Sequence, residues 1–349
     1  MVTTWVPRQR RFPRRRRLGP VLMGVMLAAI SASLMGCGRS QPAFPLPGPA
    51  ASPALNDVPA GVIVPVGQRA QGIAVDPVTG TVAVGTANPP AVILTDEAGR
   101  TRSSVALAGP ASHIEGRGPG GGFLAAIESP GTVAVIGEGG GKAGVVAGVT
   151  GQPAQTASAD GKVFVIDRSS SKVTVVDAAG IVGSVGIGFQ PDAVATDGRR
   201  LAVVGTQERT IEVLDASNDK SLGRVPAGSG PTQVVGSNSY FYVVDTAGNR
   251  ILVFASIPSV RQIASYRLAG SPYAVAIDRV HHNLWVTLTA TNELAQFQVS
   301  NGALRLVDTY STVRQPNSVA VDPVRGWVFV AGNYGGTVEI IHPPKSAPQ

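Results

Sequence analysis

The sequence predicts an all-β fold in which one group of short strands is repeated along the chain. Of the 349 residues, 44% are hydrophobic, and 43 glycines and 27 prolines interrupt them at short intervals. Such a composition favours many short strands joined by turns, because Gly and Pro are disfavoured inside helices and common in turns. Long amphipathic helices are therefore not expected.

An eleven-residue pattern, apolar at both ends and small or polar in the middle, occurs seven times. Successive copies begin 41, 40, 38, 40, 43 and 44 residues apart. A period near forty that is built from short strands is typical of β-propeller blades, so the sequence predicts a seven-bladed propeller with four strands in each blade. The copies are VAVGTANPPAV from Val82, FLAAIESPGTV from Phe123, VFVIDRSSSKV from Val163, LAVVGTQERTI from Leu201, FYVVDTAGNRI from Phe241, LWVTLTATNEL from Leu284 and VFVAGNYGGTV from Val328.

The fourth copy shows a complete blade. Residues 191–196 predict the innermost strand, residues 201–205 the second, residues 210–215 the third, and residues 220–228 contain the fourth. The turns between them, such as DGRR and TQER, are rich in the residues that reverse a chain.

The last copy has only three predicted strands, at about residues 317–321, 327–331 and 337–341. The missing fourth strand is found at the start of the repeats, where GVIVPVG at residues 61–67 matches GRVPAG at the end of the fourth blade. Proline is tolerated on the outer edge of a sheet, which is where this strand would lie. We therefore expect the N-terminal strand to complete the last blade and close the ring.

Over residues 61–342 the repeat resembles the YVTN-type β-propeller repeat of bacterial envelope proteins. That pattern runs approximately A-V-x-P-D-G, V-Y-V-T-N, T-V-S-V-I-D and then a strand that ends P-V-G-x-x-P. The resemblance implies a propeller in the bacterial cell envelope. It implies no particular activity, since the repeated residues are mostly those that build strands and turns.

The N-terminus has the three parts of an export signal. Seven arginines lie in the first 17 residues, residues 18–36 are uncharged, and Cys37 follows as the only cysteine. Leu34-Met35-Gly36-Cys37 resembles the lipobox of bacterial lipoproteins, which implies cleavage before Cys37 and lipidation of its thiol with fatty acids such as palmitate. The alternative is a retained transmembrane helix, because 19 uncharged residues are nearly enough to cross a bilayer.

This organisation gives four predicted segments. Residues 1–36 form a lipoprotein signal peptide, residues 37–59 a lipid-anchored Pro-rich tether, residues 60–344 the propeller and residues 345–349 a tail. The tether has too few large apolar residues to order itself, and its prolines favour extended conformations. The predicted location is the extracytoplasmic face of the cell membrane, with the lipid on Cys37 as the membrane attachment.

The charge distribution argues against nucleic acid as a partner. The seven N-terminal arginines leave 22 basic residues against 22 acidic ones in the rest of the chain. A neutral body lacks the basic patch that phosphate neutralisation requires. We expect a monomer.

No metal or other cofactor is expected. Aspartates recur at the first turn of several blades, but each opens a tight turn in which a short acceptor side chain bonds the backbone ahead of it. The adjacent His281 and His282 could bind a metal, yet neighbouring residues point in different directions, and we interpret them as surface residues. No Cys/His metal spacing or nucleophile elbow occurs. The aspartates are Asp76, Asp160, Asp197, Asp278 and Asp322.

His113 and Glu115 support an alternative function. Two residues apart on a strand, they share one side of it, at the passage from the first blade to the second. Propeller lyases and lactonases use His and acidic groups at the channel mouth, which makes an envelope lyase or lactonase the second hypothesis. Acid–base catalysis needs another convergent group, and no other blade offers a histidine at this position.

The first hypothesis is a non-enzymatic binding or scaffold propeller for a protein or polar ligand. Loops between blades repeat Gln before Pro, and proline restrains both its own backbone and that of the preceding residue. Each glutamine amide would then point in a defined direction at little entropic cost on binding. The residues assigned to ligand or partner binding are His113, Gln152, Gln190, Arg314, Gln315, Asn317 and Tyr334.

If Cys37 is the lipidated first residue of the mature protein, Cys37→Ser should be released from the membrane or left unprocessed. Several acyl chains are needed for stable attachment, because one chain alone gives marginal, reversible binding. Membrane fractionation and intact-mass measurement check this expectation. An unmodified Cys37, or a retained leader in the wild-type protein, would contradict it.

Overall fold

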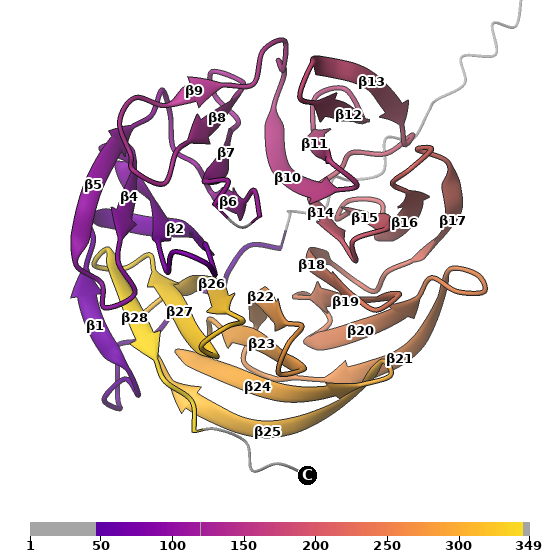
Figure 1. The fold of residues 1–349 in the computed structure, drawn as a ribbon. Coiled ribbons are helices and arrows are strands. Elements are labelled where there is room, and N and C mark those ends of the chain that lie inside the picture. The colour runs from indigo at the N-terminus through magenta and orange to yellow at the C-terminus, as the bar shows by residue number, and fades with distance from the viewer. Residues whose placement is uncertain (1–46, 119, 345–349) are drawn as a thin grey trace, which may run out of the picture. The chain divides into compact units, whose positions relative to one another are not determined.

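The protein is a seven-bladed β-propeller, as predicted. The computed structural model describes residues 47–118 and 120–344, and within them seven four-stranded antiparallel sheets form a ring (Figure 1). The predicted signal peptide, Cys37 with the first part of the tether, and the tail lie outside the described residues. Within the described ranges, no helix is long and apolar enough to span a membrane.

In blades one to six the four strands follow one another in chain order across the sheet, with the first strand nearest the centre of the ring (Figure 1). The strands of blades one to three are β2 (Gln68–Val75), β3 (Val82–Asn88), β4 (Pro90–Thr95), β5 (Thr101–Ala106); β6 (His113–Gly116), β7 (Phe123–Ile127), β8 (Thr132–Ile136), β9 (Gly144–Val145); β10 (Pro153–Ala159), β11 (Lys162–Asp167), β12 (Lys172–Asp177) and β13 (Gly180–Gly186). Those of blades four and five are β14 (Ala193–Thr196), β15 (Arg200–Gly205), β16 (Thr210–Asp215), β17 (Ser221–Pro226); β18 (Pro231–Ser237), β19 (Tyr240–Asp245), β20 (Arg250–Ala255) and β21 (Arg261–Arg267).

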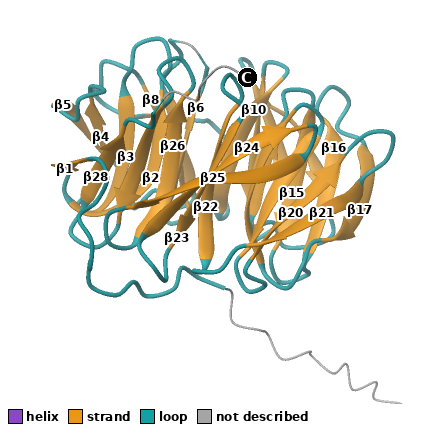
Figure 2. Cartoon of the chain, turned by 90° about the horizontal axis from the view of Figure 1, so that it is seen from below, coloured by secondary structure: helices purple, strands orange, loops and turns teal. Residues whose placement is uncertain are grey.

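Blade six has the same order, and blade seven takes its outermost strand from the other end of the propeller. The strands run between two faces of a disc, as the side view shows (Figure 2). Those of blade six are β22 (Pro272–Asp278), β23 (Asn283–Leu288), β24 (Glu293–Ser300) and β25 (Ala303–Ser311); those of blade seven are β26 (Pro316–Asp322), β27 (Trp327–Gly332), β28 (Thr337–Ile341) and β1 (Val62–Pro65).

The core lies between neighbouring blades. Second strands such as β23 are buried along their whole length, since both faces of each sheet pack against another sheet. One cluster joins Phe164 of blade three to Val203 of blade four, and another joins Val84 of blade one to Phe329 of blade seven. Burying such a side chain contributes about 1.5–3 kcal/mol, so each blade depends on both of its neighbours.

The ring closes through β1 and β28. These strands pair antiparallel with Val62 opposite Ile340 and Pro65 opposite Thr337, and the Val66 N–H donates to Gly336 O at 3.0 Å. Gly336 has φ +63°, and a Cβ there would lie 1.4 Å from Gly67 O. Only glycine allows the N-terminal strand to approach this closely.

Glu339 on β28 connects the closing strand to the loop that leads from blade six to blade seven. It is fully buried, accepts from Gly61 N at 2.7 Å and Val313 N at 3.0 Å, and also accepts from the Thr312 hydroxyl. Burial raises the pKa of Glu339, although these three donors favour the carboxylate. One side chain thus joins three segments at the closure.

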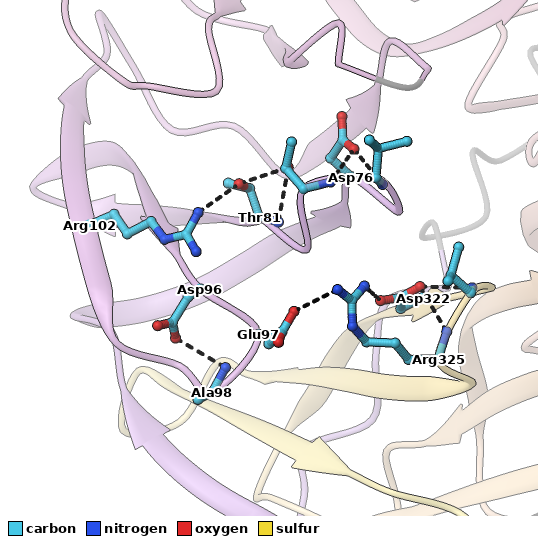
Figure 3. A network of polar contacts seen from close by, with 11 residues as sticks. Asp76, Thr81, Asp96, Glu97, Ala98, Arg102, Asp322 and Arg325 are labelled. Atoms are coloured by element: carbon cyan, nitrogen blue, oxygen red, sulfur yellow. Dashed lines mark hydrogen bonds and ion pairs between the residues drawn. The ribbon is translucent and has the colours of Figure 1, made fainter.

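On the face that contains the first turns, Arg325 joins blade seven to blade one. Its Nη1 lies 2.8 Å from Asp322 Oδ2 in its own turn, and its Nη2 lies 3.0 Å from Glu97 Oε2 of blade one (Figure 3). Arg325 and Glu97 are partly exposed, so this ion pair contributes less than about 1 kcal/mol. It supplements the backbone pairing of the closing strand.

Glu339→Ala should lower the free energy of unfolding by about 3 kcal/mol, because it leaves three donors at the ring closure without their acceptor. Glu97→Ala is the matched control and should cost less than about 1 kcal/mol. Denaturant unfolding of both variants measures the difference. Equal midpoints would show that Glu339 does not contribute to closure.

Candidate functional site

The residues before the propeller lie on one of its faces. We call residues 47–53 the strap. The face that the strap contacts is formed by the loops between blades and by the turns between second and third strands, and we call it the strap face. Sequence analysis predicted a tether that does not order itself; the strap is held by contacts with the propeller. Ser52 is buried, and strap residues are hydrogen-bonded to the loops of blades six and seven.

Gln315 binds the strap as a neighbouring strand would. Its Oε1 accepts from Ser52 N at 3.0 Å, and its Nε2 donates to Ala50 O at 2.8 Å. Residues two apart on an extended chain present their N–H and C=O in the same direction, which a single side-chain amide can satisfy. The amide of Gln315 therefore recognises an extended peptide backbone.

Four further groups hold the same short segment. The Ser52 hydroxyl donates to Thr289 O at 2.5 Å, and Thr289 Oγ1 accepts from Ala50 N at 3.0 Å. The Arg314 guanidinium donates to Ser52 O at 3.2 Å, and Asn292 Nδ2 donates to the carbonyl of the following proline at 3.1 Å. These contacts give the Pro-rich segment an order that its own composition does not supply.

The backbone of Gln315 differs from the expectation for a residue before proline. Its φ is +59°, in the left-handed region, where a non-glycine residue costs about 1–2 kcal/mol. In this conformation its N–H donates to Ser52 Oγ and to Asn292 Oδ1, both at 3.1 Å. The bonds to the strap and to the neighbouring turn stabilise the strained backbone.

The structure brings four of the predicted site residues together. Gln315 Nε2 also donates to Asn317 Oδ1 at 3.1 Å, and Asn317 lines the central channel. The Arg314 guanidinium stacks on the ring of Tyr334, with its Cζ 3.8 Å from the centroid. Sequence analysis did not assign Asn292 or Thr289 to this site. Both lie in the turn between the second and third strands of blade six, the same kind of turn that holds Tyr334 in blade seven.

Gln152 and Gln190 precede proline in the loops that enter blades three and four. Their backbones are held, since Gln152 N donates to Asp167 Oδ1 at 2.9 Å and Gln190 N donates to Glu208 Oε1 at 3.3 Å. Their side-chain amides form no hydrogen bond within the part of the chain that the structure describes. Both amides thus project from loops whose backbone is held by a hydrogen bond.

The inner strands of the seven blades enclose a channel with a cavity of about 730 Å³. Among its charged groups, Arg168 is held by ion pairs with Glu128 and, at 3.0 Å, with Asp192. Arg279 donates to the carbonyls of Gly236 and Thr196. The rest of the wall includes apolar residues from all seven inner strands.

His113 and Glu115 lie on β6 and line this channel. Both residues are half-buried. Burial lowers the pKa of His113 to about 4, against a smaller opposing effect of the Thr156 backbone, so the imidazole is neutral at pH 7. Burial raises the pKa of Glu115.

Two polar residues of β10 face the same pair. The N–H of Ser158 donates to Glu115 Oε1 at 2.5 Å. The hydroxyls of Thr156 and Ser158 lie close to the same carboxyl and lower its pKa, against the larger effect of burial. Sequence analysis did not single out Thr156 or Ser158. The sequence signal for these two residues was the segment QTAS, in which Thr156 and Ser158 are two residues apart and so lie on the same side of an inner strand.

The recurring aspartates form turns, as expected. In four of the five blades concerned, Oδ1 of the aspartate accepts from two backbone N–H groups of its own turn. His281 also contacts its turn, with Nδ1 2.7 Å from Asp278 Oδ2. Over residues 47–118 and 120–344, no group of three or more His, Cys, Asp or Glu residues is placed to hold a metal ion.

Comparison with known proteins shows the fold and no family. No protein-family model and no curated protein matches the sequence. A hydrazine synthase chain of Kuenenia stuttgartiensis has a TM-score of 0.68 at 15% identity, with 80% of this chain and 97% of the other covered. A chain of a mitotic checkpoint complex has a TM-score of 0.70 at 13% identity, covering 86% and 98%. The propeller domain of Myceliophteria thermophila Cps50 (Swd1) has a TM-score of 0.65 at 12% identity, covering 80% and 98%.

Gln315→Ala should loosen the strap, because it removes both hydrogen bonds that the amide makes to the strap backbone. Hydrogen exchange at the Ser52 amide should rise at least tenfold, since each lost bond contributes about 1 kcal/mol. Exchange mass spectrometry of the peptide that contains the strap measures this rate. Gln190→Ala is the matched control. Unchanged exchange in Gln315→Ala would show that the strap is held by other contacts.

Proposed function

We propose that this protein is a non-enzymatic binding module whose strap face takes an extended segment of a partner protein. The observation that carries the proposal is the pairing of Gln315 with the strap. In this pairing, a side-chain amide on the strap face binds the N–H and C=O groups of a polypeptide backbone. Recognition by main-chain hydrogen bonds is a common way for β-structures to bind peptides.

Gln152 and Gln190 extend this argument to a partner. Both precede proline as Gln315 does, at the corresponding loops of other blades, and both amides are unpaired within the described ranges. A partner segment passing over blades three and four could pair with them as the strap pairs at blade seven. The hydrogen bond to each backbone N–H and the proline that follows restrain the main chain that carries the amide, which reduces the entropy lost on binding.

The cellular setting is proposed from the sequence. Leu34-Met35-Gly36-Cys37 supports a lipid anchor on the extracytoplasmic face of a bacterial membrane, and the YVTN-type repeat pattern supports the envelope. One of the similar structures is a chain of a mitotic checkpoint complex, which makes a protein partner a reasonable expectation for this fold. At 13% identity it says nothing of which partner.

The alternative, an envelope lyase or lactonase using His113 and Glu115, has one supporting observation. Both residues line the channel and both have shifted pKa values. The lowered pKa of His113 would keep its imidazole available as a base. His113 Nε2, however, has no hydrogen-bond partner among the described residues that could orient it or relay its proton.

The proposal is tested by photocrosslinking on intact cells from a probe placed at Tyr334, an exposed residue of the strap face, followed by identification of the captured protein. With that partner purified, Gln152→Ala combined with Gln190→Ala should weaken binding at least tenfold, since two hydrogen bonds are lost. His281→Ala with His282→Ala, in a first turn on the opposite face, is the matched control.

Loss of binding only in the histidine variant would place the site on the opposite face. Catalytic turnover of an envelope substrate that His113→Ala abolishes would support the enzyme instead.

A further inference from the structure

Among strap residues 47–53, only Ser52 is buried. Its exposed fraction is 7%, whereas the neighbouring Ala51 and Pro53 are exposed. The Ser52 hydroxyl donates to Thr289 O at 2.5 Å and accepts from Gln315 N at 3.1 Å. An alanine makes neither bond, and a carboxylate cannot donate. The contact therefore selects a hydroxyl side chain at this position.

The bonds to the strap backbone do not depend on which side chains the segment carries. Ala50 and Ser52 each use their N–H and their C=O, and Pro53 uses its C=O. Another extended segment can bind through the same backbone groups. Because proline restricts the preceding residue to extended conformations, a Ser-Pro pair presents its serine in the required form. The contacts thus describe a ligand class, an extended segment that contains Ser-Pro.

The residues that hold the strap are also held by the propeller itself. The strap site, as we name it, consists of Thr289, Asn292, Arg314 and Gln315. Gln315 N donates to Asn292 Oδ1 at 3.1 Å, and Gln315 O accepts from Asn333 N at 2.9 Å. Thr289 Oγ1 donates to Ser271 O at 3.1 Å. None of these bonds involves the strap, so the site is preformed, and a preformed site costs less free energy to organise on binding.

The strap can leave this site without opening the ring. Residues 54–59, which follow it, form no hydrogen bond within the described ranges, and all but Pro59 are exposed. The chain is bound again at Ala60, whose N–H donates to Ser311 O at 2.9 Å, just before β1. The strap is therefore an occupant on a short connection. Such an occupant competes with free ligands at an effective concentration of roughly millimolar.

We infer that the strap site is a peptide-binding site selective for an extended segment containing Ser-Pro, and that a partner segment of this kind displaces the strap from it. This inference rests on the proposed function, since it names the partner segment that the strap face takes. The strap is the resident occupant of the site and lowers its affinity for a partner. A partner gains the site only when its segment outcompetes the strap.

The experiment uses the full chain and a fluorescein-labelled peptide of sequence PGPAASPAL, which is residues 47–55. We call the full chain with Ser52→Val the opened variant, because valine makes neither bond of the Ser52 hydroxyl. Fluorescence anisotropy should show saturable binding of the peptide to the opened variant. Binding to the wild-type chain should be at least tenfold weaker, because the strap competes for the site.

Variants of the peptide and of the site test the selectivity. Alanine in place of the peptide's serine should weaken binding to the opened variant at least tenfold, because two buried groups lose a hydrogen-bond partner. Adding Gln315→Ala to the opened variant should have an effect of the same size. Gln262→Ala, at an exposed glutamine of the outer strand β21, is the matched control and should change nothing.

Two measurements check the opened variant itself. Hydrogen exchange should be faster in its strap than in the wild-type strap, and thermal melting confirms that the propeller is folded. If Ser52→Val does not fold, Ala50→Pro replaces it, since it removes the N–H that donates to Thr289. Unchanged exchange in the strap of a folded Ser52→Val chain would contradict the role of the hydroxyl.

The inference is overturned if the opened variant does not bind the peptide, or if the alanine peptide binds equally well. Equal affinity of the wild-type chain and the opened variant would show that strap and peptide do not share a site. If a captured partner still requires Gln152 and Gln190 in any of these cases, this inference fails and the proposed function stands. Peptide binding here, with a partner that docks on the opposite face, would instead remove the proposed function.

Discussion

The pairing of β1 with β28 is the contact on which the whole propeller depends. Every blade is a single sheet that is apolar on both faces, so each must be covered by two neighbours. Only a closed ring gives all seven blades two neighbours. β1 adds the fourth strand to blade seven and brings blade seven against blade one. Glu339 accepts a hydrogen bond from Gly61 N, in the chain that leads into β1.

This closure also determines the path of the preceding residues. Ala60 N donates to Ser311 O at 2.9 Å, so the chain reaches β1 past the end of blade six. The strap then lies on the adjacent loops, where Gln315, Arg314 and Asn292 hold it. The same N-terminal segment thus completes the fold and occupies part of the proposed binding face. The proposed peptide binding on that face and the stability of the ring are therefore physically connected.

Predictions from the repeat pattern were accurate because that pattern is local. Each of the seven windows begins within one residue of the start of a second strand, since a short apolar run bounded by turn residues is recognised without knowing its distant partners. The position of β1 was predictable from its match to the end of blade four. The channel was not predictable in the same way. Thr156 and Ser158 belong to β10, about forty residues from His113, and nothing near them in the chain identifies their partners.

The amino-acid sequence by itself determined the number of blades and the turn role of the aspartates, because both follow from propensities and spacings within about forty residues. It also determined the closing strand, because residues 61–67 match the end of blade four. It also identified Gln315 as an amide presented at the rim. Only the tertiary structure decided that this amide binds residues 50–52, and that Glu115 on the channel wall lies against Thr156 and Ser158 of the next blade. Both arrangements join segments that meet only when the propeller folds, and their contacts depend on side-chain directions that no local pattern encodes.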